Sequence, residues 1–483
     1  MPMRKPVLIL LLFMVFLAGC RKPGPDRPVS GFADVSRVAS GKAVAVMMTA
    51  YRTTLFADGQ DRSLLRIALT DSAGREITSA SDTCRIYVDG DAQITPYGKK
   101  EILPVLTDTA GKEYAHCILE GGLCFLDLHA GKVPGKIKVE VACDTLWRSS
   151  HEIHSIPADM ALLKPSKDQL RMPSRPVGRM IGADISFLPQ LESRGMKFYD
   201  RGTEKDAMAI LKDHGFNYIR LRIFVNPEKG KGYSPVEGFC DLQHSLAMAR
   251  RIYDAGMNIL LNFHYSDYWA DPQQQNKPES WAALSFEALK DTMRTYTRDV
   301  LSAFSRQGTP VAMVQVGNEV NHGLLWPDGH ISRMDNLAGL LRAGVEGVRE
   351  ADTSMLVMMH IALGGQNEEA VFWLDNMIAR GVTFDVIGLS YYPRWHGTLD
   401  DLEANLADLA GRYHKYVNVV EYAAFRKEVN EIVFRLPGEM GKGTCIWEPL
   451  GWWVGLFDRE GNATNEILIY NKLRENYLIN PKP

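Results

Sequence analysis

An alternation of short apolar runs with helical stretches, from residue 178 to the end of the chain, is the feature that most constrains the fold. This alternation is typical of βα units, in which helices cover a parallel sheet. Eight of the runs are predicted strands, and eight parallel strands close a (β/α)8 barrel. They are Ile181–Ser186, Tyr218–Phe224, Asn258–Tyr265, Ala312–Glu319, Leu356–Ala362, Val386–Tyr392, Asn418–Tyr422 and Thr444–Glu448. We therefore expect an α/β fold with a TIM barrel over residues 178–483.

Residues 35–160 show a different pattern, of short alternating segments separated by turn signals such as Asp71–Gly74 and Asp89–Asp91. Little helical period accompanies them, so they predict a small all-β sandwich. The order of its turn motifs resembles that of the immunoglobulin-like modules attached to bacterial carbohydrate enzymes. Because no stripe of Trp or Tyr is evident in its strands, we expect a spacer rather than a sugar-binding module. A polar, proline-bearing linker over residues 161–177 follows it.

The first 20 residues have the pattern of an export signal. A basic start, Met1–Lys5, precedes an apolar run, Val7–Phe16, that is too short to span a bilayer as a stable helix. The segment Leu17–Cys20 resembles a bacterial lipobox, which would make Cys20 the lipidated first residue of the mature protein. A simple secretory peptide with an incidental cysteine is the alternative. Residues 21–34 are a predicted tether, and the expected location is the outer-membrane surface of a Gram-negative cell envelope.

Charge and cysteine usage exclude several classes of partner. With 55 basic and 58 acidic residues, the formal net charge of −3 gives no attraction for nucleic acid or an anionic membrane. A monomer is expected. The remaining cysteines lack metal-type CxxC spacing and are expected to be mostly free, buried thiols, although Cys117 and Cys124 are close in sequence. They are Cys84, Cys117, Cys124, Cys143, Cys240 and Cys445.

Polar side chains end almost every predicted barrel strand, and two of them are glutamates, Glu319 and Glu421. In a (β/α)8 barrel the carboxyl ends of the strands hold the catalytic side chains. Two carboxylic groups at such ends suggest glycoside cleavage, in which one protonates the departing oxygen and the other attacks or stabilises the sugar carbon. Further polar residues at the predicted strand ends are Asp184, Ser186, Arg220, Arg222, Asn262, His264, His360 and Glu448.

The neighbours of the two glutamates suggest different roles. Glu319 follows Asn318, whose amide can bind a sugar hydroxyl beside the reacting carbon, so Glu319 is the predicted acid/base. Glu421 is the predicted nucleophile, kept ionised by Arg222 and by the phenol of Tyr392. If the two carboxyl groups lie about 5 to 5.5 Å apart, the reaction retains the anomeric configuration.

Longer strings of sequence make the resemblance specific. Asn318-Glu319 on the fourth strand with Glu421 on the seventh resembles the large clan of retaining (β/α)8 glycosidases. Five strings together resemble the endo-β-1,4-galactanases of glycoside hydrolase family 53. They are Gly182–Ser186, Leu211–Arg222, Asn262–Pro272, Val314–Asn321 and Asp385–Pro393. The resemblance implies hydrolysis of β-1,4-galactan and type I arabinogalactan, with galactooligosaccharides as products.

Residue by residue, the resemblance assigns the acid/base to Glu319 and the nucleophile to Glu421. Trp326 and Trp395 could extend an aromatic platform for neighbouring sugars. After the nucleophile, Glu421-Tyr-Ala-Ala-Phe425 departs from the family's Glu-Thr-Ala-Tyr-Pro, and the loop there is short and lacks oxygen ligands for calcium. Neither a metal nor a cofactor is therefore expected. Expected substrate-binding residues are Asp184, Arg222, His264, Asp267, Trp269, Asn318, Ser390, Tyr392 and Trp447.

Two alternatives remain open at this point. A retaining glycosidase of the same clan could act on another β-linked polymer, such as mannan or xylan. A non-catalytic, glycan-binding lipoprotein could use an inactive barrel, although such a protein has no need of both Glu319 and Glu421.

Overall fold

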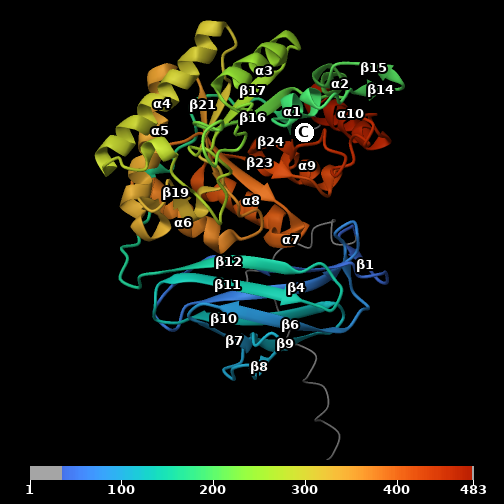
Figure 1. Ribbon diagram of the computed structural model, residues 1–483, viewed down its shortest axis with the longest axis vertical. Coiled ribbons are helices and arrows are strands. Elements are labelled where there is room, and N and C mark those ends of the chain that lie inside the picture. Colours follow the sequence, from blue (N-terminus) through green and yellow to red (C-terminus); the bar gives the residue numbers. More distant parts are fainter. Residues whose placement is uncertain (1–34, 481–483) are drawn as a thin grey trace, which may run out of the picture.

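The computed structural model describes residues 35–480, which form two domains stacked along the long axis of the molecule (Figure 1). An all-β domain packs against one end of a helix-covered barrel. The predicted signal peptide, Cys20 and the tether lie outside the described residues. Among the helices of residues 35–480, none is both long and apolar enough to cross a membrane.

The N-terminal domain is a sandwich of two six-stranded sheets, as the alternating pattern predicts. Along β11 the alternation is plain, because Lys136 and Lys138 face solvent while Ile137 and Val139 are fully buried. The first sheet contains β1 (Arg37–Val38), β5 (Glu76–Ile77), β4 (Arg62–Thr70), β10 (Leu123–Ala130) and β7 (Ala92–Pro96), with β2 (Ala45–Ala50) paired to β4. The second contains β3 (Thr54–Phe56), β12 (Ser149–Ile156), β11 (Gly135–Ala142), β6 (Asp82–Asp89), β9 (Glu113–Leu119) and β8 (Leu106–Thr107).

One disulfide crosses the second sheet of the sandwich. Cys84 on β6 bonds Cys143, which directly follows β11, and these two strands are antiparallel neighbours. The sequence separation of 59 residues hides this pair from any argument based on spacing. Cys117, Cys124, Cys240 and Cys445 are free, so the expectation of mostly free thiols holds for four of the six.

The C-terminal domain is a closed barrel of eight parallel strands, which confirms the predicted fold class. Most strands end one to three residues before the predicted ends, because the polar residues there leave the ladder and enter the loops. The strands are β13 (Met180–Asp184), β16 (Tyr218–Ile223), β17 (Asn258–Phe263), β18 (Met313–Val316), β21 (Leu356–Ile361), β22 (Val386–Tyr391), β23 (Tyr416–Tyr422) and β24 (Gly441–Trp447).

Helices surround the barrel and bury its outer surface. α4 shows how they are delimited: the Ser285 hydroxyl caps its first turn, and Gly308 ends it in the left-handed conformation at φ 78°. The helices are α1 (Leu188–Ser193), α2 (Ala207–Asp213), α3 (Leu242–Asp254), α4 (Phe286–Gln307), α5 (Met334–Ala351), α6 (Asn367–Ala379), α7 (Pro393–His396), α8 (Leu399–Tyr413), α9 (Arg426–Phe434) and α10 (Leu468–Arg474). Two small hairpins, β14 (Tyr199–Asp200) with β15 (Thr203–Glu204) and β19 (Gly323–Leu324) with β20 (Gly329–His330), lie in the loops.

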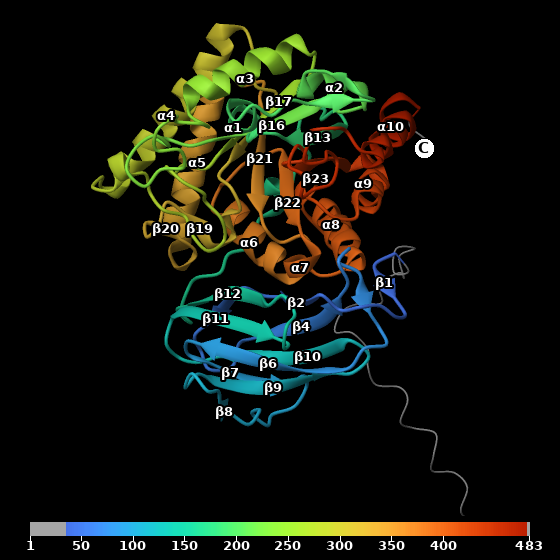
Figure 2. The same cartoon turned by 45° about the vertical axis from the view of Figure 1, so that its right-hand side comes forward.

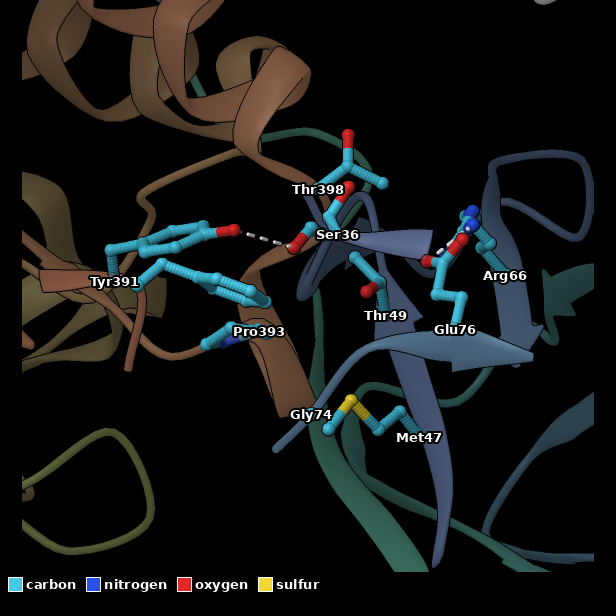
Figure 3. Close-up of a pocket in the computed structure, with 11 residues that line it drawn as sticks. Ser36, Met47, Thr49, Arg66, Gly74, Glu76, Tyr391, Pro393 and Thr398 are labelled. Carbon is cyan, nitrogen blue, oxygen red and sulfur yellow. Dashed lines mark hydrogen bonds and ion pairs between the residues drawn. The ribbon is translucent and has the colours of Figure 1, made fainter. Parts of the chain in front are cut away.

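The sandwich packs against helical segments that follow β18, β21 and β22, at the carboxyl ends of the barrel strands (Figure 2). Phe56 of the sandwich meets Phe372 of α6 edge to face, with ring centroids 6.1 Å apart. The cavity between the domains, lined by Glu76 and Arg66 on one side and Tyr391 on the other, measures about 10 Å³ (Figure 3). Because that space holds about one water molecule, the two domains are closely docked there.

Candidate active site

The carboxyl ends of the barrel strands bring the two predicted catalytic glutamates into one cluster. Glu319 follows β18, and Glu421 lies in β23 with 8% of its surface exposed. The charge of Glu421 is close enough to affect the pKa of Glu319. The other predicted residues that come to the same end of the barrel are Asp184, Arg222, His264, Asn318, Ser390, Tyr392 and Trp447.

The backbone takes an unusual conformation where three of these strands end. Tyr265, Glu319 and Glu448 follow β17, β18 and β24, and they have positive φ angles of 50°, 49° and 47°. A left-handed conformation costs a non-glycine residue about 1–2 kcal/mol, so surrounding contacts must hold it. Residues of this kind concentrate at functional sites, and here Glu319 is one of them.

Arg220 is the positive partner of Glu421. Its Nη2 lies 2.8 Å from Glu421 Oε1 and donates to Asn318 Oδ1 at 2.9 Å, while Nη1 bonds Asp184 Oδ2 at 2.7 Å. The Tyr392 hydroxyl donates to the other oxygen of Glu421 at 3.4 Å. Burial raises the pKa of Glu421, and the charge of Arg220 and the bond from Tyr392 oppose that rise.

The prediction that Arg222 holds Glu421 is wrong. Both arginines lie on β16, two residues apart, and both form an ion pair with Asp184. Their second carboxylate partners differ, because Arg220 reaches Glu421 and Arg222 reaches Glu448. Arg220 is level with Asp184 in the ladder, whereas Arg222 Nη1 bonds Glu448 Oε1 at 2.5 Å. Burial raises the pKa of Glu448 to about 8, with Arg222 opposing the rise.

Glu319 has neutral hydrogen-bond partners. The Ser390 hydroxyl lies 2.5 Å from Glu319 Oε1, and His360 Nε2 lies 2.9 Å from the Ser390 oxygen. The backbone N–H of Glu319 donates to His360 Nδ1 at 3.3 Å, so we assign the ring proton to Nε2. His360 then donates to Ser390, and Ser390 donates to Glu319 Oε1. This relay leaves Oε2 of Glu319 as the oxygen that carries its acidic proton.

Burial, and then the negative charge of Glu421, raise the pKa of Glu319 well above its usual value. Burial also holds the pKa of His360 well below its usual value, so the relay beneath Glu319 is uncharged. Arg220 forms an ion pair with Glu421, whereas no ion pair to Glu319 is found within residues 35–480. The arrangement therefore favours one proton on the pair, held by Glu319, with Glu421 ionised.

Aromatic rings continue from this cluster along the barrel rim. Trp269 and Trp447 have ring centroids 6.4 Å apart, and Phe187 meets both Trp447 and Trp453 edge to face. The Arg222 guanidinium lies 4.3 Å from the centroid of Phe187 and 4.4 Å from that of Trp269. Arg222 thus supports the aromatic wall from its ring faces. Aromatic rings of this kind can stack on the apolar face of a sugar ring.

The other two predicted platform residues lie in different surroundings. Trp395 packs edge to face on Tyr392, with centroids 6.0 Å apart, and stays beside the site. Trp326 instead packs on His154 of the sandwich and donates from its indole N–H to the His322 carbonyl. Trp326 therefore belongs to the contact between the two domains rather than to an open sugar platform. Sequence spacing cannot show this, because Trp326 and His154 are far apart in the chain.

Several predicted substrate-binding groups already have protein partners. Asp267 accepts bonds from the backbone N–H groups of Asn226 and Glu279, and so ties two loops together. His264 Nδ1 accepts from the Ala270 N–H, and its ring is 2% exposed. Asp184 is fully buried between Arg220 and Ser186. Their hydrogen bonds hold the strand ends and loops of the site in place.

Residues that the sequence left without a role prove central to the cluster. They are Arg220, Gln315, His360, Glu448, Phe187 and Trp453. The signal for the polar ones is a polar residue in or at the end of a buried apolar run, as at Gln315 in β18 and His360 in β21. In the described part of the chain, no group of three or more His, Cys, Asp and Glu is arranged to hold a metal ion.

Comparison with known proteins agrees with this site. Residues 180–439 match "Glycosyl hydrolase family 53", and residues 46–152 match "Glycoside hydrolase family 2 C-terminal domain 5". The chain is similar to an uncharacterized protein of Niallia circulans, with 38% identity over 59% of this chain and 89% of that protein. It is also similar to an arabinogalactan endo-beta-1,4-galactanase A of Aspergillus niger, with 36% identity over 56% of this chain and 85% of that protein.

A solved structure supports the same conclusion. The "Ignisphaera aggregans GH53 catalytic domain" has a TM-score of 0.58 and 29% identity, and the match covers 65% of this chain and 99% of that domain. The resemblance inferred from the sequence strings is thereby confirmed. Because the family match spans more than half of the 483 residues, the chain belongs to glycosyl hydrolase family 53 and is a glycoside hydrolase.

Proposed function

We propose that this enzyme cleaves internal β-1,4-galactosidic linkages of galactan and type I arabinogalactan, with retention of the anomeric configuration. The unequal surroundings of the two glutamates carry the proposal. Glu421 is bonded to the Arg220 guanidinium, whereas Glu319 is bonded to the neutral Ser390. The substrate is suggested by relatives that are named galactanases, among them the Aspergillus niger protein.

In the first step, a Glu421 oxygen attacks the anomeric carbon while the bond from that carbon to the leaving sugar oxygen breaks. Glu319 gives its proton to that oxygen, so the departing sugar leaves neutral. The product is a glycosyl ester on Glu421 and an ionised Glu319. As Glu421 becomes an ester, its negative charge disappears, and the pKa of Glu319 falls accordingly.

In the second step, the ionised Glu319 takes a proton from a water molecule, and the water oxygen attacks the anomeric carbon. The ester bond breaks and returns the carboxylate to Glu421, beside Arg220. Two inversions give net retention. The Tyr392 hydroxyl, 3.4 Å from Glu421 Oε2, helps to hold the carboxylate of Glu421 in place for both steps.

Incubation with pectic galactan, mannan and xylan tests the substrate. We expect reducing ends from galactan alone, and β-anomers as the first products detected by NMR. Cleavage confined to mannan or xylan would contradict the galactan assignment. Absence of cleavage from all three would favour a non-catalytic glycan-binding protein, and initial α-anomers would contradict the retaining mechanism.

We also propose that the enzyme is a lipoprotein of the cell envelope, displayed at the outer-membrane surface through Cys20. The support is the Leu17–Cys20 segment after a basic and apolar start. Metabolic labelling with a radioactive fatty acid should mark the parent protein but not the Cys20→Ser variant. Equal labelling of both proteins would contradict this anchor.

A further inference from the structure

The sandwich contacts the loops that carry the proposed catalytic groups. Its backbone N–H groups at Thr53 and Thr54 donate to Glu369 Oε2, in the first turn of α6 after β21. The Tyr51 hydroxyl donates to Asp401 Oδ2 at 3.0 Å, in the first turn of α8 beyond β22. The segment at residues 51–54 therefore lies against the catalytic end of the barrel rather than at a distance from it.

One of these contacts reaches the turn that holds Glu319. The short 3-10 helix Val320–His322 begins directly after Glu319, and His322 is 1% exposed. Its Nδ1 lies 2.8 Å from the Pro272 carbonyl oxygen, which can only accept, so Nδ1 carries the ring proton. Nε2, 2.9 Å from Thr53 Oγ1, then accepts the hydroxyl proton of Thr53. Burial holds the pKa of His322 well below its usual value, which agrees with a neutral ring.

A second sandwich residue packs on the same imidazole. The His154 ring, from β12, lies with its centroid 4.1 Å from that of His322 and 5.1 Å from that of His330. His154 Nδ1 is 2.9 Å from His330 Nε2, and His330 ends the hairpin beyond the turn. Trp326 closes the cluster by donating to the His322 carbonyl. His322 is therefore held from the barrel by Pro272 and from the sandwich by Thr53 and His154.

Glu319 needs such support because its backbone is left-handed, at φ 49° and ψ 52°. The barrel supplies part of it: the Gln275 side chain donates to the Asn318 carbonyl at 2.8 Å, and the Trp373 indole donates to the Val320 carbonyl at 3.0 Å. The Thr53 hydroxyl adds a bond from the sandwich domain, at the far end of the same turn.

We infer that Thr53 of the sandwich is a positioning residue for proton donation by Glu319, acting through His322. The inference rests on the proposed role of Glu319 as acid/base. A general acid must lie within hydrogen-bond reach of the leaving oxygen, and a displacement of about 1 Å can cost about 100-fold in rate. The sandwich domain then helps to position a catalytic residue of the barrel and is more than a spacer.

The test compares substrates that differ in their need for a proton. In the full-length protein, Thr53→Val keeps the shape of the side chain but leaves Nε2 of His322 buried without a donor. We expect kcat on galactan to fall about tenfold with KM unchanged, as for a group displaced within the site. On a nitrophenyl glycoside of a galactooligosaccharide, whose leaving group needs no proton, kcat/KM reports formation of the glycosyl ester and should change less than about twofold. Thr53→Ser should restore kcat on galactan.

Tyr51→Phe is the matched control, because it removes a hydroxyl bond across the same interface that leads to α8 instead. It should leave the ratio of the two activities at the parent value. Equal losses of Thr53→Val on both substrates, or no loss on galactan, would overturn the inference. Thr53→Ala provides a second removal of the hydroxyl if the valine disturbs folding. Failure of the proposed function would appear separately, as a parent enzyme that cleaves neither substrate.

Discussion

The surroundings of Glu319 and those of Glu421 differ in one respect that matters for catalysis, the charge of the nearest partner. Glu421 bonds a guanidinium that is itself held by Asp184, while Glu319 bonds a hydroxyl at the end of a neutral relay from His360. Burial raises the pKa of both carboxyl groups, so burial alone would treat them alike. The partners therefore decide which of the two keeps the proton.

The largest effect is expected from removal of the charged member of the pair. Glu421→Ala deletes the attacking oxygen, and turnover of galactan and of aryl galactooligosaccharides should both fall by at least about 10⁴-fold. Reducing-end release and nitrophenol release measure the two rates. Substantial activity of this variant on either substrate would remove Glu421 from the role of nucleophile.

The effect of removing Glu319, the protonated member of the pair, should depend on the leaving group of the substrate. Glu319→Ala should lower kcat on galactan by about 10²–10⁴-fold, because the departing sugar oxygen then receives no proton. Formation of the glycosyl ester from a nitrophenyl substrate should be nearly as fast as in the parent, as a burst of nitrophenol would show. A variant that gives no burst of nitrophenol would contradict the acid/base assignment.

The fold was largely predictable because strand and helix periodicity are local properties of the chain. The eight barrel strands all occur near their predicted positions, and the errors lie at the ends, where residues such as Glu319 and Tyr265 have positive φ angles. A polar residue at the end of an apolar run can extend the strand or begin the loop, and nothing local separates these outcomes.

The two glutamates were predictable because a carboxylate at the end of a buried strand stands out. Their partners were not, since Arg220 and Arg222 share one face of β16 and only the contacts in the folded barrel show which glutamate each one reaches. The bond from Thr53 to His322 was beyond the sequence for another reason. It joins residues 269 positions apart across two domains, and domain docking has no local pattern.

Loss of the positive charge beside Glu421 should narrow the difference between the pKa values of Glu421 and Glu319. Arg220→Gln removes the guanidinium that opposes the rise in the pKa of Glu421, so this pKa should increase further. Glu421 must be ionised to attack, and activity is lost as pH falls through its pKa; the acid limb of the pH–rate profile should therefore move to higher pH. The maximal rate should fall about 10²–10³-fold, as expected when electrostatic support is lost.

Arg222→Gln is the matched control for this shift. It removes a guanidinium from the same strand and a comparable buried ion pair, but the lost partner is Glu448. Both variants should lose stability, by about 3–5 kcal/mol, because each leaves a buried carboxylate unpaired. Thermal unfolding measures that loss, while only Arg220→Gln should move the acid limb. An equal movement in both variants would show that Arg220 has no specific role at Glu421.

The smallest effect is expected from removal of the Ser390 hydroxyl, the neutral hydrogen-bond partner of Glu319. The Ser390 hydroxyl stabilises the ionised form of Glu319, so Ser390→Ala should raise the pKa of Glu319 further above its usual value. Glu319 must be protonated in the first step, and activity on galactan is lost as pH rises through its pKa. The alkaline limb should therefore move to higher pH, the opposite end of the profile from the Arg220→Gln shift. One neutral hydrogen bond contributes about 0.5–1.5 kcal/mol, which limits the fall in kcat to about tenfold. An unmoved alkaline limb would show that the proton on Glu319 is governed by burial and by Glu421 alone.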